Sequence, residues 1–242
     1  MTTGNFADDV RTPLTPPADV NTKDTGQSIL DNGLKDFLDR FHRNKLFLGF
    51  RYGNVWGYNL VEQVNNPAFI EGLKLTAQAG LTLDSANPTP DLVVALVKVK
   101  DKVPDLRIVL DHTAKLAPGL SSISPRERKE LEASLLELAR RPGTFFKPSE
   151  FMQTDQNGKP IGDPGVYRPI FDYLLGLFGE DRAIFGSDWP NGSAVDHLDL
   201  IVKIARDYFA SKSRAAQEKF FWRNSISAYR WIKRSPSQPQ AV

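Results

Sequence analysis

Short apolar runs alternate with helix-like repeats along most of the chain. The runs end at polar or charged residues and predict strands over Leu46–Arg51, Leu81–Asp84, Leu106–Leu110, Thr144–Lys147 and Arg182–Phe185. Elsewhere, apolar residues recur at the spacing of one helix face. That spacing predicts helices over Leu30–Phe41, Pro67–Ala79, Pro90–Val99, Pro125–Arg140, Val166–Phe178, Val195–Phe209 and Ala215–Trp231.

This alternation predicts the fold class. Strands separated by helices of ten or more residues indicate βαβ units and parallel pairing. Continuous apolar strands are typical of a sheet that is covered on both faces. We therefore expect an α/β protein of the (β/α) TIM-barrel type, with its strands adjacent in chain order. A doubly wound sheet fits the same pattern, although no Gly-x-Gly-x-x-Gly follows any strand.

The two ends of the chain differ from its middle in composition. Residues 1–28 are rich in Thr, Pro, Asp and Asn and predict an irregular arm, and the polar residues 235–242 predict a flexible tail. We expect the barrel domain to occupy residues 29–234. Met1–Val20 lacks the apolar stretch of a secretory signal, and no apolar run approaches the ~20 residues of a membrane helix. These features predict a cytoplasmic protein.

Charge and cysteine content narrow the choice of partners. The 242 residues include 31 basic and 29 acidic side chains and no cysteine. Such a balanced charge argues against nucleic acid or a membrane as the main partner. The lack of cysteine excludes thiol catalysis, thiolate metal sites and disulfides. This composition is compatible with a small-molecule substrate.

Polar side chains gather at the predicted strand ends, where parallel barrels hold their reacting groups. In chain order these are Arg51, Asp84 with Asn87, Asp111 with His112, Lys147 with Ser149, and Asp188 with Trp189. Each of these strand ends has a plainer explanation, because a strand end needs only a turn residue. The repeated convergence of ionisable groups is what favours a site.

Asp188 and His112 are the candidate catalytic residues. An aspartate at a barrel mouth can act as a general base, because its neighbours tune its pKa. A histidine can polarise a carbonyl group, shuttle a proton or bind a metal. The structural alternatives are a packed Asp111–His112 pair and a turn over residues 186–188 that Asp188 caps.

The other strand-end side chains are candidates for substrate binding. Arg51 and Lys147 suit a substrate carboxylate, which Arg can bind through a bidentate fork. The remaining members of this predicted set are Asp84, Asn87, Ser149 and Trp189.

Two segments carry a family resemblance. Pro104–His112 resembles the sixth-strand motif of amidohydrolase-related (amidohydrolase family 2) barrels, and Phe178–Pro190 resembles their eighth-strand motif. Leu48–Arg51 resembles an earlier strand end, and Phe146–Ser149 resembles the seventh. The most similar branch is that of the lactonases, which includes fuconolactonases and pyrone dicarboxylate lactonases. The similarity runs from about Leu30 to Trp231.

This resemblance implies a hydrolase that opens a lactone or a similar cyclic ester of a small carboxylic acid. In this scheme Asp188 activates water, His112 polarises the carbonyl group, and Arg51 and Lys147 bind the acid group. The lactonase branch has members that need no metal. We therefore expect no required cofactor; if a divalent ion such as zinc does bind, His112 and Asp188 are the expected ligands.

The chain also departs from the family pattern. The family's first strand carries His-x-His, whereas the three histidines here are His42, His112 and His197. We therefore expect a barrel that is incomplete at its N-terminal side. The alternative function is a truncated, catalytically impaired barrel that acts as a binding or assembly protein. Open edge strands would favour such association, including a homo-oligomer.

Overall fold

A computed structural model gives the fold. It describes Leu38, Phe41, Asn44, Leu46 and residues 47–54, 58–85, 87–112, 123–191, 196–232 and 236–238. The strands in this part of the chain are β1 (Gly49–Arg51), β2 (Thr82–Ser85), β3 (Arg107–Asp111) and β4 (Thr144–Lys147). The helices are α3 (Leu60–Gln63), α4 (Pro67–Gln78), α5 (Pro90–Lys102), α6 (Pro125–Ala139), α7 (Pro164–Phe178), α8 (Leu198–Phe209), α9 (Arg214–Glu218), the π-helix η3 (Lys219–Arg223) and α10 (Asn224–Tyr229).

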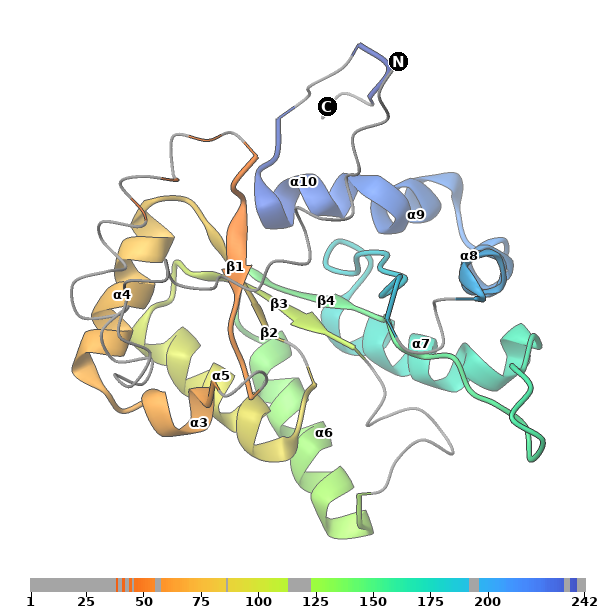
Figure 1. Cartoon of the computed structure of the whole chain (residues 1–242), viewed down its shortest axis with the longest axis horizontal. Coiled ribbons are helices and arrows are strands. Elements are labelled where there is room, and N and C mark those ends of the chain that lie inside the picture. Colours follow the sequence, from red (N-terminus) through yellow and green to blue (C-terminus); the bar gives the residue numbers. More distant parts are fainter. Residues whose placement is uncertain are drawn as a thin grey trace.

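The four strands form one parallel sheet in the order β1-β2-β3-β4 (Figure 1). The α/β fold and the pairing of these strands in chain order are therefore confirmed. Arg51 lies opposite Asp84 in the register of β1 and β2, and Asp111 lies opposite Lys147 in that of β3 and β4. This register brings the carboxyl ends of the strands to one edge.

The predicted fifth strand is reduced to a single parallel bridge between Phe146 and Ala183. Phe146 donates a backbone hydrogen bond to Arg182 and accepts one from Ile184. One residue later the chain leaves the sheet, because the Phe185 amide donates to the Phe220 carbonyl instead. The bridge still places the segment that leads to Asp188 beside β4.

Proline and short polar side chains set the starts of the main helices. Proline occupies the first turn of α4, α5, α6 and α7. Proline has no backbone N–H, and in the first turn an N–H would have no hydrogen-bond partner within the helix. At α6, Ser124 and Glu127 form a reciprocal capping box. The predicted starts at Pro67, Pro90 and Pro125 are confirmed.

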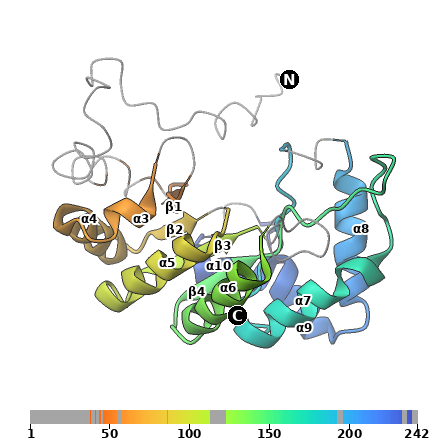
Figure 2. The ribbon, with the colours of Figure 1, turned by 90° about the horizontal axis from the view of Figure 1, so that it is seen from below.

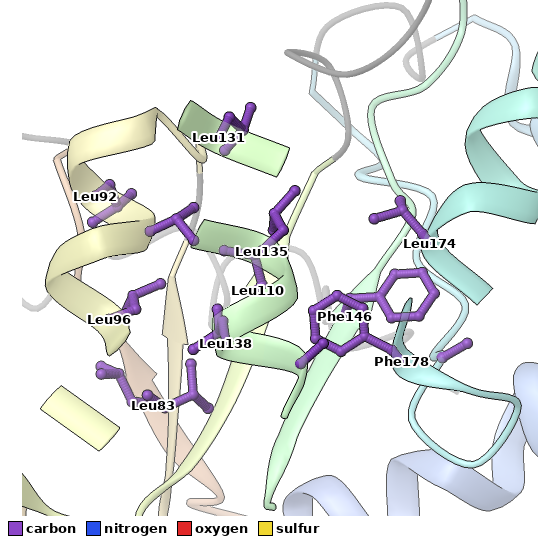
Figure 3. Close-up of a cluster of buried hydrophobic side chains, with 14 of the residues drawn as sticks. Leu83, Leu92, Leu96, Leu110, Leu131, Leu135, Leu138, Phe146, Leu174 and Phe178 are labelled. Atoms are coloured by element: carbon purple, nitrogen blue, oxygen red, sulfur yellow. The ribbon is translucent and has the colours of Figure 1, made fainter. Parts of the chain in front are cut away.

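The main core lies between the outer face of the sheet and helices α5, α6 and α7. Leu83, Leu110 and Phe146 project from three successive strands onto these helices (Figure 3). The helix residues packed there include Leu92, Leu96, Leu131, Leu135, Leu138, Leu174 and Phe178. Helices α7 and α8 lie at the end of the molecule away from α3 and α4 (Figure 2).

The opposite, inner face of the sheet is covered by α10. Val109, Phe145 and Ile184 form a separate buried cluster with Ala228. Thr82 and Arg107 each donate a 2.7 Å side-chain hydrogen bond to the Ala228 carbonyl. Helix α10 therefore packs where the interior of a barrel would be.

Some predictions differ from the structure or lie outside the described part. The predicted helix Ala215–Trp231 consists of α9, η3 and α10 in succession, and α8 begins at Leu198. The predicted helix over 30–41 and the arm over 1–28 fall mainly or wholly outside the described residues, as does most of the tail. Among the described helices, none has the length and apolar character needed to cross a bilayer.

Candidate active site

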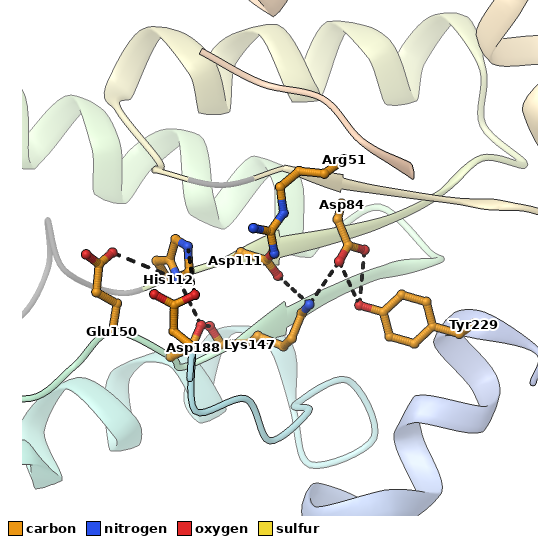
Figure 4. Close-up of polar contacts among 9 residues, drawn as sticks. Arg51, Asp84, Asp111, His112, Lys147, Glu150, Asp188 and Tyr229 are labelled. Atoms are coloured by element: carbon orange, nitrogen blue, oxygen red, sulfur yellow. Dashed lines mark hydrogen bonds and ion pairs between the residues drawn. The ribbon is translucent and has the colours of Figure 1, made fainter. Parts of the chain in front are cut away.

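Four ionisable side chains meet with Tyr229 at the carboxyl ends of the strands. Lys147 Nζ lies 2.9 Å from Asp84 Oδ2 and 2.8 Å from Asp111 Oδ1, and Arg51 lies 2.6 Å from Asp111 Oδ2 (Figure 4). The Tyr229 hydroxyl, which comes from the end of α10, is 3.0 Å from both Asp84 oxygens. We call these five residues the charge array.

Charges within the array are balanced: two carboxylates face one ammonium and one guanidinium. Burial and the nearby Asp111 raise the pKa of Asp84 to about 6, although Lys147 and Tyr229 oppose this. For Lys147, burial favours the neutral form, but Asp84 and Asp111 outweigh it and raise its pKa. Lys147 is therefore a cation whose charge is already neutralised by the protein.

A second group surrounds His112, directly after β3. His112 Nδ1 lies 2.9 Å from Ser149 Oγ, and its Nε2 lies 3.9 Å from Asp188 Oδ1 (Figure 4). Glu150 Oε2 lies 4.0 Å from Nδ1. We call His112, Glu150 and Asp188 the His112 cluster. Their ligand atoms all lie within 4.8 Å of one another.

Local backbone geometry directs these three side chains. His112, Glu150 and Asp188 each have a positive φ, of 72°, 51° and 62°. Few non-glycine residues adopt this conformation, and each here follows a strand or the bridge segment. The His112 amide also donates to the Lys147 carbonyl, which extends the β3–β4 pairing by one bond.

His112 is the most enclosed member of the cluster, with 7% of its side chain exposed, compared with 13% for Asp188 and 43% for Glu150. Burial lowers the pKa of His112 and outweighs the opposing effect of Asp188 and Glu150. The imidazole is therefore neutral at neutral pH.

Gly186 owes its place to packing rather than to its φ angle. The sequence allowed a turn over residues 186–188, and the positive φ in this segment belongs to Asp188 rather than to Gly186. A Cβ at Gly186 would lie 3.2 Å from Lys147 Cδ and 3.5 Å from Ser149 Cβ. Glycine therefore lets the segment that carries Asp188 pass close to β4.

The remaining predicted site residues, Asn87 and Trp189, are both exposed. Asn87 has a φ of 57°, and Trp189 is 52% exposed.

A cleft of about 350 Å³ opens beside β1 and is lined by residues 46–50, Arg51, Asp84 and Tyr229. The cleft reaches the charge array, whereas His112 and Asp188 do not line it.

Glu150 and Tyr229 were missing from the sequence-based set. Glu150 directly follows Ser149, so an acidic residue at the fourth strand end was a signal available in the sequence. Tyr229 lies 145 residues from Asp84 along the chain, and no local pattern links the two. Which of these residues bind substrate or act in catalysis stays a prediction.

Comparisons with known proteins agree with the fold and with the family resemblance. An L-fucono-1,5-lactonase of Burkholderia ambifaria is 32% identical over 112 residues, which are 46% of this chain and 35% of that protein. The chain spans between 35% and 65% of the length of the curated relatives that it matches.

Solved structures of amidohydrolases share the fold. An amidohydrolase from Burkholderia multivorans with bound HEPES has a TM-score of 0.71 at 20% identity, covering 84% of this chain and 71% of that one. A second crystal form, with bound zinc, has a TM-score of 0.61 over 76% of this chain and 64% of that one, again at 20% identity. A probable 2-pyrone-4,6-dicarboxylic acid hydrolase from Acinetobacter baumannii, with citric acid bound, has a TM-score of 0.60 at 14% identity, covering 83% and 70%.

The amidohydrolase family model matches residues 34–231, which include every described strand and helix from β1 to α10. This range also contains the charge array and the His112 cluster. The resemblance to this family and to its lactonase branch is confirmed, and the chain belongs to the amidohydrolase family.

Proposed function

We propose that the protein is a hydrolase that opens a lactone or similar cyclic ester of a small carboxylic acid, with Asp188 as general base. The observation that carries the proposal is the 3.9 Å separation of His112 Nε2 and Asp188 Oδ1. This separation exceeds a direct hydrogen bond, so His112 Nε2 and Asp188 Oδ1 do not bond to each other. Each can therefore contact its own reacting group, His112 a carbonyl oxygen and Asp188 a water.

Asp188 would remove a proton from the attacking water, and the ring carbonyl would accept a hydrogen bond from His112. His112 can donate from Nε2 only when Nε2 carries the imidazole hydrogen. Nδ1 is then an acceptor, so Ser149 must donate its hydroxyl hydrogen to Nδ1. Ser149 Oγ is 2.9 Å from Nδ1, which suits such a bond. After attack, the ring oxygen leaves as an alcohol by taking up the proton held by Asp188.

Arg51 is the better candidate for the acid group of the substrate. Its side chain is 31% exposed, borders the cleft beside β1 and has one carboxylate partner, Asp111, in the described structure. The charge of Lys147 is matched by Asp84 and Asp111. We propose Lys147 as a residue that holds the array together and Arg51 as the carboxylate contact.

The proposed hydrolysis requires no metal, although one structural relative was crystallised with zinc. The donors in this chain that fit a divalent ion are His112, Glu150 and Asp188, since one imidazole and two carboxylates lie within 4.8 Å. A bound ion would polarise the substrate carbonyl group and lower the pKa of a bound water.

Purified protein should be tested on L-fucono-1,5-lactone and 2-pyrone-4,6-dicarboxylate, with acid release followed at constant pH. We expect hydrolysis of at least one of them above the rate without protein. Arg51→Lys should raise KM more than it lowers kcat, because the bidentate fork is lost and a positive charge remains. No hydrolysis of either probe, with or without added zinc, would contradict the proposal.

The second candidate is a binding or assembly protein. It is favoured by β1, which within the described residues pairs with β2 and with no strand on its other side. An open edge of this kind can pair with another chain. Light scattering on the purified protein that gives a dimer or larger species, together with no turnover, would favour this second candidate.

A further inference from the structure

Charge is distributed unevenly on the two sides of His112. Arg51, which is 31% exposed and borders the cleft, lies on one side, and Glu150 lies on the other (Figure 4). In the described part of the chain, neither Glu150 nor Asp188 forms an ion pair with a lysine or arginine. Even a protonated His112 would balance one of these two carboxylates and leave the other. The site therefore presents a guanidinium at one end and an unbalanced carboxylate at the other.

Glu150 is the more accessible of the two carboxylates. The exposed fraction of its side chain is 43%, against 13% for Asp188. Its Oε2 lies 4.0 Å from His112 Nδ1, which is too far for a hydrogen bond, and Ser149 Oγ occupies that nitrogen at 2.9 Å. No described residue donates a hydrogen bond to the Glu150 carboxylate. Its oxygens are therefore open to a group of the substrate.

The turn after β4 holds Glu150 in this place. The Ser149 amide donates a 2.8 Å hydrogen bond to the Lys147 carbonyl, and Glu150 follows with a φ of 51°. A non-glycine residue adopts such a φ only where its surroundings hold the backbone there. The carboxylate therefore stands at a defined point beside His112, although its side chain is partly exposed.

We propose that Glu150 is a specificity-determining residue, which repels an acid group at the His112 end of the substrate and accepts a hydrogen bond from a hydroxyl group there. The inference rests on the Arg51 contact of the proposed function, because that contact fixes which end of the substrate faces Glu150. The substrate class is then a lactone with one acid group on the Arg51 side and a hydroxyl group on the Glu150 side. A hydroxyl that donates to a carboxylate makes a charge-assisted hydrogen bond.

The size of the effect follows from the two charges. Like unit charges about 6 Å apart, at an effective dielectric constant of about 40, weaken binding by about 10-fold. Such a dielectric constant lies between those of a protein surface and of water, which suits a carboxylate that is 43% exposed. Hydrolysis also turns the ester carbonyl into a new carboxylate beside His112, so the same repulsion would favour release of the product.

The test is an NMR titration that measures the dissociation constants of two acids for the full chain. The probes, 5-hydroxypentanoate and glutarate, share one carboxylate and differ at the other end, which is a hydroxyl group in the first and a second carboxylate in the other. The parent should bind 5-hydroxypentanoate at least ~10-fold more tightly than glutarate. Glu150→Gln should lower this preference by about 10-fold, because glutamine keeps the size of the side chain without its charge.

Glu132→Gln is the matched control, since its side chain is 42% exposed against 43% for Glu150 and it lies on α6. The control should keep the preference of the parent. A parent that binds neither acid or binds both equally, or a Glu150→Gln variant with the preference of the parent, would overturn the inference. The titration needs no turnover, so a preference that depends on Glu150, found without lactone hydrolysis, would contradict the proposed function alone.

Discussion

Replacing Lys147 tests whether it holds the charge array together or binds substrate. Lys147→Met keeps most of the apolar stem but removes the cation between Asp84 and Asp111. Both contacts are short, at 2.9 and 2.8 Å, and 15% of the lysine side chain is exposed. The hydrogen bond from Lys147 to the Asp84 carboxylate alone contributes about 1.5–3 kcal/mol. Removing one partner from a buried ion pair costs about 3–5 kcal/mol, so we expect a loss in that range.

Urea unfolding, followed by circular dichroism, measures this loss as a lower midpoint at an unchanged slope. The matched control is Lys203→Met, because Lys203 pairs with Asp207 on α8 and 64% of its side chain is exposed. The control should change stability by less than ~0.5 kcal/mol. Adding Asp84→Asn to Lys147→Met should recover part of the loss, since one of the two unbalanced carboxylates is removed.

The loss should also depend on pH. The pKa of Asp84 is raised to about 6 in the folded parent, so its ionisation weakens the fold as pH rises through 6. Without Lys147 that pKa should rise further, because the opposing cation is gone. The difference in the free energy of unfolding between the parent and Lys147→Met should therefore be largest near pH 8 and should shrink towards pH 5. A loss below 1 kcal/mol at pH 8, with a raised KM, would refute the structural role and favour substrate binding.

Two further substitutions test other contacts of the site. Tyr229→Phe removes the hydroxyl that bonds Asp84. It should lower the free energy of unfolding by about 1.5–3 kcal/mol in urea titrations. An unchanged urea midpoint would show that α10 does not reach the array. Gly49→Ala would put a Cβ 2.0 Å from the Thr82 carbonyl oxygen and push β1 from β2. The free energy of unfolding should fall by about 1–3 kcal/mol. A thermal midpoint equal to that of the parent would contradict this pairing.

The sequence predicted the fold better than the contacts inside the site. Apolar runs located β2, β3 and β4 to within one residue, because buried parallel strands leave a continuous apolar signal. The same signal predicted a strand over Arg182–Phe185, but the backbone amide of Phe185 donates to the Phe220 carbonyl and ends the pairing with β4. It also began β1 three residues early, at Leu46 rather than Gly49.

The strand-end residues were predictable, but their pairing was not. Parallel strands bring their carboxyl ends together, so the meeting of Arg51, Asp84 and Lys147 follows from the pattern. Which charge neutralises which depends on register and rotamers, and these placed Lys147 between two aspartates. The Glu150 side chain joins His112 through a left-handed backbone conformation, which sequence spacing does not predict.

The break within the C-terminal helix has a tertiary cause. The side-chain Nδ2 of Asn224 donates to the backbone carbonyls of Glu180 and Ala183, which anchors the chain where η3 meets α10. A π-helical turn just before this point changes the helix face that follows. Ala228 and Tyr229 then face the sheet, a result that hydrophobic spacing alone could not supply.

Turnover by Asp188→Asn measures the central claim most directly. Asparagine keeps the size of the side chain but cannot take a proton from water, so kcat on a hydrolysed lactone should fall by ~100-fold or more. The melting temperature should stay close to that of the parent, since the Asp188 carboxylate makes no hydrogen bond with another described residue. A variant that hydrolyses the lactone at the parent rate would contradict the account, as Asp188 would then be a turn residue only.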